Sequence, residues 1–416
     1  MRRVALVVIG TSILVVLVVG SCWAASERAS TLERENRIER QQELETLYPE
    51  QIGMNETARE LIALARSFGL EIEGEGGADE IRAAPFIAIR ELHRDYLRAV
   101  ITTADDDIAP PPVQLAEFLD SHRKQLGDLS TLLVESDLPR FPLDVSLLSG
   151  PEQPKFLGQV RVLQLLAVAA LDEARTNRHQ AAWRHLEAVW RVTRSLLERP
   201  EIPSQVVGIT GARVVAGVAR KLDPPVPRWY AEVGRFEYDS SLERALGAER
   251  VFTERLQTPD GGIFESLRRG EIRDVLLRPW HRRAAVRQGD AIEEAIEALP
   301  LDDICSFDVA AFESMLREAA SLFPGVDPPS MPSLGGAVLR FANLLIDLEV
   351  TDRILASKEG ESPARGRTFG SVRCPAARWI HESDSSGTLT IRFEGSLAQL
   401  DPPAWNLPRA HRISRR

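Results

Sequence analysis

The chain has 416 residues, of which 44% are hydrophobic and 27% charged, so it can bury a sizeable core and is not disordered throughout. Its 51 basic side chains are outnumbered by 61 acidic ones, and the resulting net charge of -10 argues against nucleic acid as a partner. Aromatic residues make up only 6% of the chain, and a composition rich in Ala, Leu, Arg and Glu favours helices over sheets.

Residues 1–25 predict a leader that reaches the membrane. Two arginines precede a run from Val4 to Ser26 that carries no charged side chain. As a helix, its most apolar part would span about 24 Å, just past the length usual for a cleavable signal peptide. Arginines before the run place the N-terminus in the cytoplasm. We therefore expect an uncleaved inner-membrane anchor, with the body in the periplasm or at the cell exterior.

Two alternatives for this leader stay open. The segment Val19-Gly20-Ser21-Cys22 resembles a bacterial lipobox, which implies a lipoprotein that is acylated on Cys22 and has lost the preceding residues. Small residues around Ala24 also fit cleavage by signal peptidase and full secretion. Trp23 favours the anchor, because indole rings prefer the headgroup level of a membrane.

Residues 26–48 predict a charged juxtamembrane helix. Its sparse apolar positions do not keep a heptad, so a spacer helix is favoured over a dimeric coiled coil.

Residues 49–362 predict an α-helical body. Asn55 is a candidate N-cap for its first helix, which Gly69 would close. The hydrophobic periodicity predicts further helices over residues 81–103, 113–134, 204–222, 238–257, 263–277, 282–298, 309–323 and 334–357.

Residues 155–200 predict a helical hairpin that turns at Asn177. Small and bulky residues alternate in "ALDEARTNRHQAAWRHLEAVW", and this segment is similar to one unit of a tetratricopeptide array. No second copy follows at the expected spacing of about 34 residues. We therefore predict an irregular stack of helical hairpins with one tetratricopeptide-like unit, and not a regular solenoid.

Residues 363–416 predict a β-containing segment and a basic tail. Apolar and polar side chains alternate from Leu389 to Glu394, which indicates a strand, and Trp379–Glu382 would pair with it across the turn "SDSSG". Because two strands alone are marginal in water, this β-hairpin must pack on the helices. The predicted fold class is thus mainly α, with a small C-terminal β-hairpin element.

The cysteines allow one disulfide. If lipid occupies Cys22, Cys305 and Cys374 remain as an even pair in a compartment where disulfides persist. The bond would join the late helices to the C-terminal segment. Alternatively, each of the two is a small buried apolar side chain.

The standard phosphate, zinc and nucleophile motifs are missing from the sequence, which therefore predicts no catalytic residue, cofactor or metal site. His179 and His185 lie six apart, a spacing unlike that of a metal pair on one helix face. His93 is expected to be a hydrogen-bonded core histidine. Asp105–Asp107 is expected to form a solvated turn at a helix end, because a calcium loop would need a glycine and a distal glutamate.

One basic cluster is a candidate anion-binding patch. Its members are Arg278, His281, Arg282, Arg283 and Arg287. Guanidinium groups suit anionic lipid, a phosphorylated ligand or an acidic partner. The alternative is a basic helix face balanced by the acidic residues just downstream.

Together these features predict a membrane-tethered extracytoplasmic helical protein of the bacterial envelope, with a protein-interaction or scaffold role. The alternative is a membrane-attached hydrolase or ligand-binding protein, with a site drawn from Glu173, Arg175, His185 or Arg282. A third hypothesis is a structural spacer that dimerises through residues 26–47.

Overall fold

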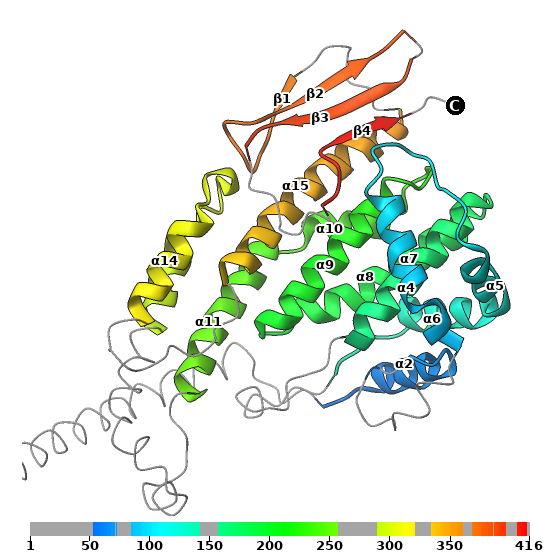
Figure 1. Ribbon diagram of the computed structural model, residues 1–416, viewed down its shortest axis with the longest axis horizontal. Coiled ribbons are helices and arrows are strands. Elements are labelled where there is room, and N and C mark those ends of the chain that lie inside the picture. The colour runs from blue at the N-terminus through cyan, green and yellow to red at the C-terminus, as the bar shows by residue number, and fades with distance from the viewer. Residues whose placement is uncertain are drawn as a thin grey trace, which may run out of the picture.

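The computed structural model describes residues 53–70, 72, 85–141, 157–256, 289–320, 334–360, 368–385, 387–396 and 406–413, and all structural statements concern these parts of the chain (Figure 1). They form a mainly helical body with a small antiparallel sheet near the C-terminus, so the predicted fold class is confirmed. The predicted leader and the predicted juxtamembrane helix lie outside the described residues.

Most of the described helices match predicted ones, whereas the predicted helix 263–277 and the first part of the predicted helix 282–298 lie outside the described residues, and the short helix at Ala231–Arg235 was not predicted. The described helices are α2 (Glu56–Ser67), α4 (Pro85–Ile101), α5 (Val113–Ser121), α6 (Arg123–Glu135), α7 (Leu157–Arg175), α8 (His179–Leu197), α9 (Ile202–Ala219), α10 (Ala231–Arg235), α11 (Tyr238–Leu256), α14 (Val309–Ala320) and α15 (Leu334–Lys358), with short 3-10 turns at Arg228–Tyr230 and Ile304–Ser306. Asn55 caps α2 as expected, since its side chain accepts a hydrogen bond from the backbone N–H of Ala58 at 3.0 Å.

The predicted hairpin is formed by α7 and α8 and lies at the centre of the helical body. Asn177 makes the turn with a φ of 59°, a left-handed conformation that Asn tolerates better than most residues. α9 packs against both helices, α4 covers α7, and α6 covers α8 (Figure 1). The hairpin therefore supplies much of the core, and its largest buried side chain is Trp190.

Helix α9 approaches α8 closely because glycines face it. A Cβ atom built on Gly208 would lie 2.7 Å from the side chain of Leu197, and one on Gly211 would lie 2.4 Å from that of Thr193. α9 is long and apolar enough to cross a membrane by length and composition, but 78% of this stretch is buried inside the protein. Such burial is typical of a core helix.

One predicted helix is wrong in its extent. The periodicity of residues 113–134 predicts a single helix, but the structure has two, α5 and α6, separated at His122. The side chains of Ser121 and His122 both reach back to the carbonyl oxygen of Phe118, at 3.0 and 2.9 Å. Such local side-chain bonds compete with the regular helix and bend it without a proline or glycine.

The C-terminal sheet has four antiparallel strands in the order β1 (Thr368–Gly370), β2 (Arg378–Ser383), β3 (Leu389–Glu394) and β4 (Ala410–Ile413). The predicted hairpin corresponds to β2 and β3, in which Trp379 pairs with Phe393. β4 lies in the predicted basic tail and adds a further strand, since Ile413 pairs with Leu389. The sheet rests on α15, which gives the strands the apolar partner that they require (Figure 1).

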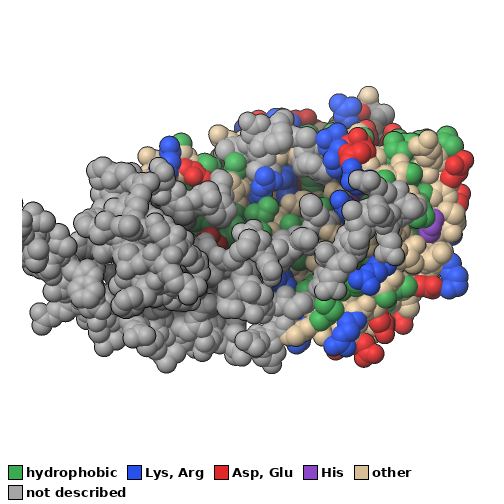
Figure 2. Space-filling model, turned by 60° about the horizontal axis from the view of Figure 1, so that its bottom comes forward, with side chains coloured by type: hydrophobic (Ala, Val, Ile, Leu, Met, Phe, Trp, Pro, Cys, Tyr) green, Lys and Arg blue, Asp and Glu red, His purple; other side chains and the backbone are tan. Residues whose placement is uncertain are grey.

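Charged side chains of both signs lie on the surface of the described part. Lys, Arg, Asp and Glu side chains are intermixed over the described face that Figure 2 shows. Val113 and Val372 are the large hydrophobic side chains that the described residues leave exposed. Scattered apolar residues of this kind are normal and do not by themselves mark an interface.

Candidate functional site

Several predicted site residues lie outside the described residues. They are Cys22, the candidate lipidation site, and the basic patch Arg278, His281, Arg282, Arg283 and Arg287. Both stay predictions.

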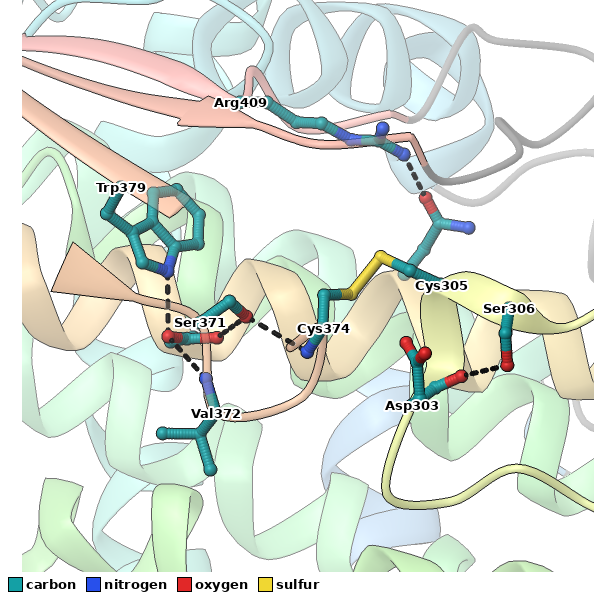
Figure 3. The surroundings of a disulfide bond; sticks show 10 residues. Asp303, Cys305, Ser306, Ser371, Val372, Cys374, Trp379 and Arg409 are labelled. Carbon is teal, nitrogen blue, oxygen red and sulfur yellow. Dashed lines mark hydrogen bonds between the residues drawn. A yellow bond between two sulfur atoms is a disulfide. The ribbon is translucent and has the colours of Figure 1, made fainter. Parts of the chain in front are cut away.

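Cys305 and Cys374 are joined by a disulfide in the structure. Their Cα atoms are 5.3 Å apart across a sequence separation of 69 residues, and the bond ties the segment before α14 to the loop between β1 and β2. Figure 3 shows a hydrogen-bond network beside it. The carboxylate of Glu349 on α15 accepts hydrogen bonds from Ser371 and from the indole N–H of Trp379, both at 2.7 Å. The loop that carries Cys374 is therefore anchored to α15.

Three of the residues predicted for the hydrolase alternative lie around the junction of α6, α7 and α8; they are Glu173, Arg175 and His185. His185 is buried, and its Nδ1 lies 2.6 Å from the hydroxyl of Ser130 on α6. Glu173 accepts a hydrogen bond from Arg123 at 2.8 Å and pairs with Arg178. Burial, and then the positive charge of Arg123, lower the pKa of His185 to about 4.

Chemically, this junction is a packed structural cluster. The side chain of Ser130 is fully buried against His185, so the nucleophile of a serine–histidine pair has no route to a substrate here. Arg175 pairs with its neighbour Asp172 at 2.8 Å, whereas Arg282 lies outside the described residues.

His93 is a hydrogen-bonded core histidine, as predicted, with its Nε2 3.1 Å from the side-chain oxygen of Gln164. The prediction of a solvated acidic turn is wrong for Asp106. Its carboxylate lies 2.9 Å from both Lys358 at the end of α15 and His411 in β4. Burial would raise the pKa of Asp106, but the bonds to His411 and Lys358 outweigh it and hold that pKa below its ordinary value. The turn thus fastens β4 to the helices.

A second polar cluster, which we call the arginine site, lies between α9, α15 and the segment before β4. Arg213 and Arg220 come from α9, Asp347 from α15, and Arg409 from the residues preceding β4. Arg213 and Arg220 are seven residues apart, so they lie on one face of α9. Asn343 and Asp347 are four apart and share a face of α15, which packs against α9.

The carboxylate of Asp347 is the centre of the arginine site. Its Oδ2 accepts a hydrogen bond from Nε of Arg213 at 2.7 Å, and its Oδ1 lies 3.5 Å from Nη2 of Arg220. Arg409 donates to the side-chain oxygen of Asn343 at 3.1 Å, and Figure 3 shows Arg409 in the surroundings of the disulfide. Burial lowers the pKa of Arg409, the nearby charge of Asp347 opposes that change, and the charge of Arg213 adds to it.

Arg220 has a structural role in this site. It is 1% exposed and donates to the hydroxyl of Thr351 at 2.8 Å, to the carbonyl oxygen of Pro408 at 2.9 Å and to the backbone oxygen of Asp347 at 2.8 Å. Its bonds join α9, α15 and the segment before β4. Burial lowers the pKa of Arg220, and the charge of Asp347 opposes this shift.

Arg213 differs from Arg220 because it keeps hydrogen-bond donors without a described partner. Its Nε is bonded to Asp347, but its two Nη nitrogens have no hydrogen-bond partner among the residues that the structure describes. These two nitrogens are not completely enclosed. They account for part of the solvent-exposed surface of Arg213, which is 7% exposed. The arginine site can therefore donate hydrogen bonds and positive charge to a further group.

The sequence analysis missed this site, although a signal was present. Two arginines seven residues apart on the apolar helix "IPSQVVGITGARVVAGVAR" have to be buried together and need a buried acceptor. The apolar helix α15 carries candidate acceptors at intervals of four residues, which are Asn343, Asp347 and Thr351. A search for polar residues that share a face of a buried helix would have found both sets.

Among the described residues, no group of three or more His, Cys, Asp or Glu side chains could hold a metal ion. Comparison of the chain with models of protein families, with curated proteins and with solved structures finds no match. Any functional conclusion must therefore come from the residues themselves.

Proposed function

We propose that the protein is a membrane-tethered extracytoplasmic protein of the bacterial envelope, whose helical body binds a partner or ligand without making or breaking bonds. The disulfide between Cys305 and Cys374 is the observation that carries the location. Disulfides form and persist in oxidising compartments and are rare in the cytosol. An apolar leader that follows two arginines supplies the route to such a compartment.

Binding is supported by the chemistry of the arginine site. Arg213 and Arg220 share the single carboxylate of Asp347, and the two Nη nitrogens of Arg213 have no hydrogen-bond partner among the described residues. Guanidinium groups stay protonated at all ordinary pH values and recognise anions without exchanging protons. A ligand-binding role follows from this site more directly than a hydrolytic one.

A protein-docking or scaffold role, predicted from the tetratricopeptide-like hairpin, is the second candidate. α7 and α8 turn most of their surface to the core, so a docked protein would contact the outer helices and the sheet instead. A pull-down from detergent-solubilised membranes, compared with a strain that lacks the protein, tests this role. Recovery of no partner above background would count against it.

The location is tested by fractionation, intact mass and thiol labelling of the native protein. We expect it in the membrane fraction, either with the full-length mass or with the mass of a chain acylated on Cys22. We also expect Cys305 and Cys374 to resist a thiol reagent until a reductant is added. Unprocessed, unlipidated protein with reactive Cys305 and Cys374 in the cytosol would refute the proposal.

A further inference from the structure

The geometry between the C-terminal sheet and α15 points to an acid-sensitive contact, and we propose that protonation of His381 loosens the packing of β2 and β3 on α15. The disulfide and the bonds of β4 would keep the loosened sheet attached to the helices. This inference goes beyond the binding role proposed above, and it depends neither on a ligand nor on the membrane tether.

His381 lies on the face of the sheet that packs against α15. It pairs with Ile391 of β3, which in turn pairs with His411 of β4. Residues directly opposite each other in antiparallel strands share a face of the sheet, so the two histidines flank Ile391 in one row. All three side chains are buried, and β3 and β4 contact α15 (Figure 1). His381 is therefore part of the core beneath the sheet.

The ring of His381 has no hydrogen-bond partner among the described residues. Both of its nitrogens are fully enclosed and unpaired, and the ring packs instead against that of Phe369 in β1, with the centroids 5.0 Å apart. A neutral imidazole carries one N–H donor and one acceptor, so this burial already costs free energy. A proton would add a second donor and a charge, for which the described residues provide no acceptor.

The charged groups around His381 do not compensate a proton on its ring. Arg353 of α15 lies over the ring of Phe369, with its Cζ 5.3 Å from the centroid, and the carboxylate of Glu349 is engaged by Trp379 and by Arg353 itself. β1 carries no charged residue. The other charged side chains nearby point elsewhere, Asp352 toward α10 and the following four to the opposite face of the sheet: Arg378, Glu382, Arg392 and Glu394. Burial, and then the charge of Arg353, lower the pKa of His381.

His411 shows the opposite arrangement in the same row. Its Nε2 lies 2.9 Å from the carboxylate of Asp106. Burial lowers the pKa of His411, the bond to Asp106 opposes that shift, and the charges of Arg220 and Lys221 at the end of α9 add to it. A proton on His411 would therefore meet a carboxylate, whereas a proton on His381 would meet none. We assign the acid response to His381 and the retention of β4 to His411.

The direction of the response follows from the lowered pKa of His381. Below about pH 6.5, the ring takes up a proton more readily where the sheet has opened than where it is packed on α15. The contribution of this packing to stability is thus complete above that pH and is lost as the pH falls. The disulfide still ties the loop between β1 and β2 to the segment before α14, so acid should open the sheet locally without detaching it.

Hydrogen–deuterium exchange of the full-length oxidised protein in detergent, at pH 7.5 and pH 5.0, tests the inference by comparing wild type with His381→Phe. The variant keeps an aromatic ring beside Phe369 but cannot take up a proton. Amide protection is corrected for the pH dependence of intrinsic exchange. On acidification, β2 and β3 should lose protection by a factor roughly 5-fold greater in the wild type than in the variant. Peptides of α7 and α8, which report on His185 in both proteins, should change equally in the two.

The matched control is His122→Gln, which removes a partly exposed histidine at the break between α5 and α6 and should lose strand protection as the wild type does. Equal losses in the strands of the wild type and of folded His381→Phe, or no loss in either, overturn the inference. It is also overturned if the control behaves like His381→Phe. If a melting curve at pH 7.5 shows that His381→Phe is not folded, His381→Leu replaces it, with the same expected result and the same refuting outcomes.

Discussion

Breaking the disulfide between Cys305 and Cys374 should destabilise the protein strongly, and its effect can be calculated from the sequence separation. The bond closes a loop of 69 residues. In the chain-entropy model, a loop of that length restricts the unfolded chain by about 15 cal/mol/K, which is roughly 4 kcal/mol at 25 °C. At about 2 °C per kcal/mol for a large domain, the melting temperature should fall by roughly 8 °C.

The assay is thermal unfolding of the full-length protein in detergent, followed by tryptophan fluorescence with and without dithiothreitol. The double variant Cys305→Ser/Cys374→Ser should melt at the temperature of the reduced wild type and should not respond to the reductant. The double variant retains Cys22, so any response of this variant to dithiothreitol would come from Cys22 and not from the disulfide. Melting of the double variant within about 2 °C of the oxidised wild type would refute the reasoning, because the cross-link would then not restrict the unfolded chain.

Three further predictions concern the helical body. Gly211→Val should lower the free energy of unfolding by about 1–3 kcal/mol, because its Cβ would collide with the side chain of Thr193. The control Gly127→Ala, where nothing lies within 4 Å of the new Cβ, should raise the free energy of unfolding by roughly 0.5–1 kcal/mol. Urea denaturation compares the two variants, and equal effects would contradict the packing argument. Burial lowers the pKa of His185 to about 4, so below about pH 6.5 this histidine is protonated in the unfolded chain before it is protonated in the folded protein. The free energy of unfolding should therefore fall by roughly 3 kcal/mol between pH 6.5 and pH 4. The variant His185→Gln should show a smaller fall over the same pH range. Arg220→Met should lower the free energy of unfolding by about 3–5 kcal/mol, because it leaves buried acceptors of α15 and of the segment before β4 unpaired. A melting temperature equal to that of the wild type would show that the hydrogen bonds of Arg220 contribute nothing to stability.

Much of the helical architecture could be predicted from the sequence, because the relevant signals are local. The hairpin of α7 and α8 follows from its periodicity and from the turn at Asn177, and both are properties of adjacent residues. The break at His122 was missed because it comes from side chains that bond to the backbone of Phe118, not from a proline or glycine.

The sheet was only half predictable. β2 and β3 are joined by a short turn and alternate clearly, whereas β1 and β4 have three and four residues and too little pattern to be recognised. β4 exists because β3 offers it a hydrogen-bonding edge and because Asp106 holds His411. Neither condition can be deduced from the residues of β4 alone.

The sequence by itself determined the helical class, the central hairpin, the core position of His93 and the pair of cysteines available for a cross-link. These features follow from periodicity and composition, which are properties of neighbouring residues. The tertiary structure decided that Arg213 meets Asp347 across 134 residues and that Arg220 meets Pro408 across 188. The physical reason is that a buried charge needs a partner but does not specify which one. Only the packing of α9 against α15 and of the chain before β4 selects these groups.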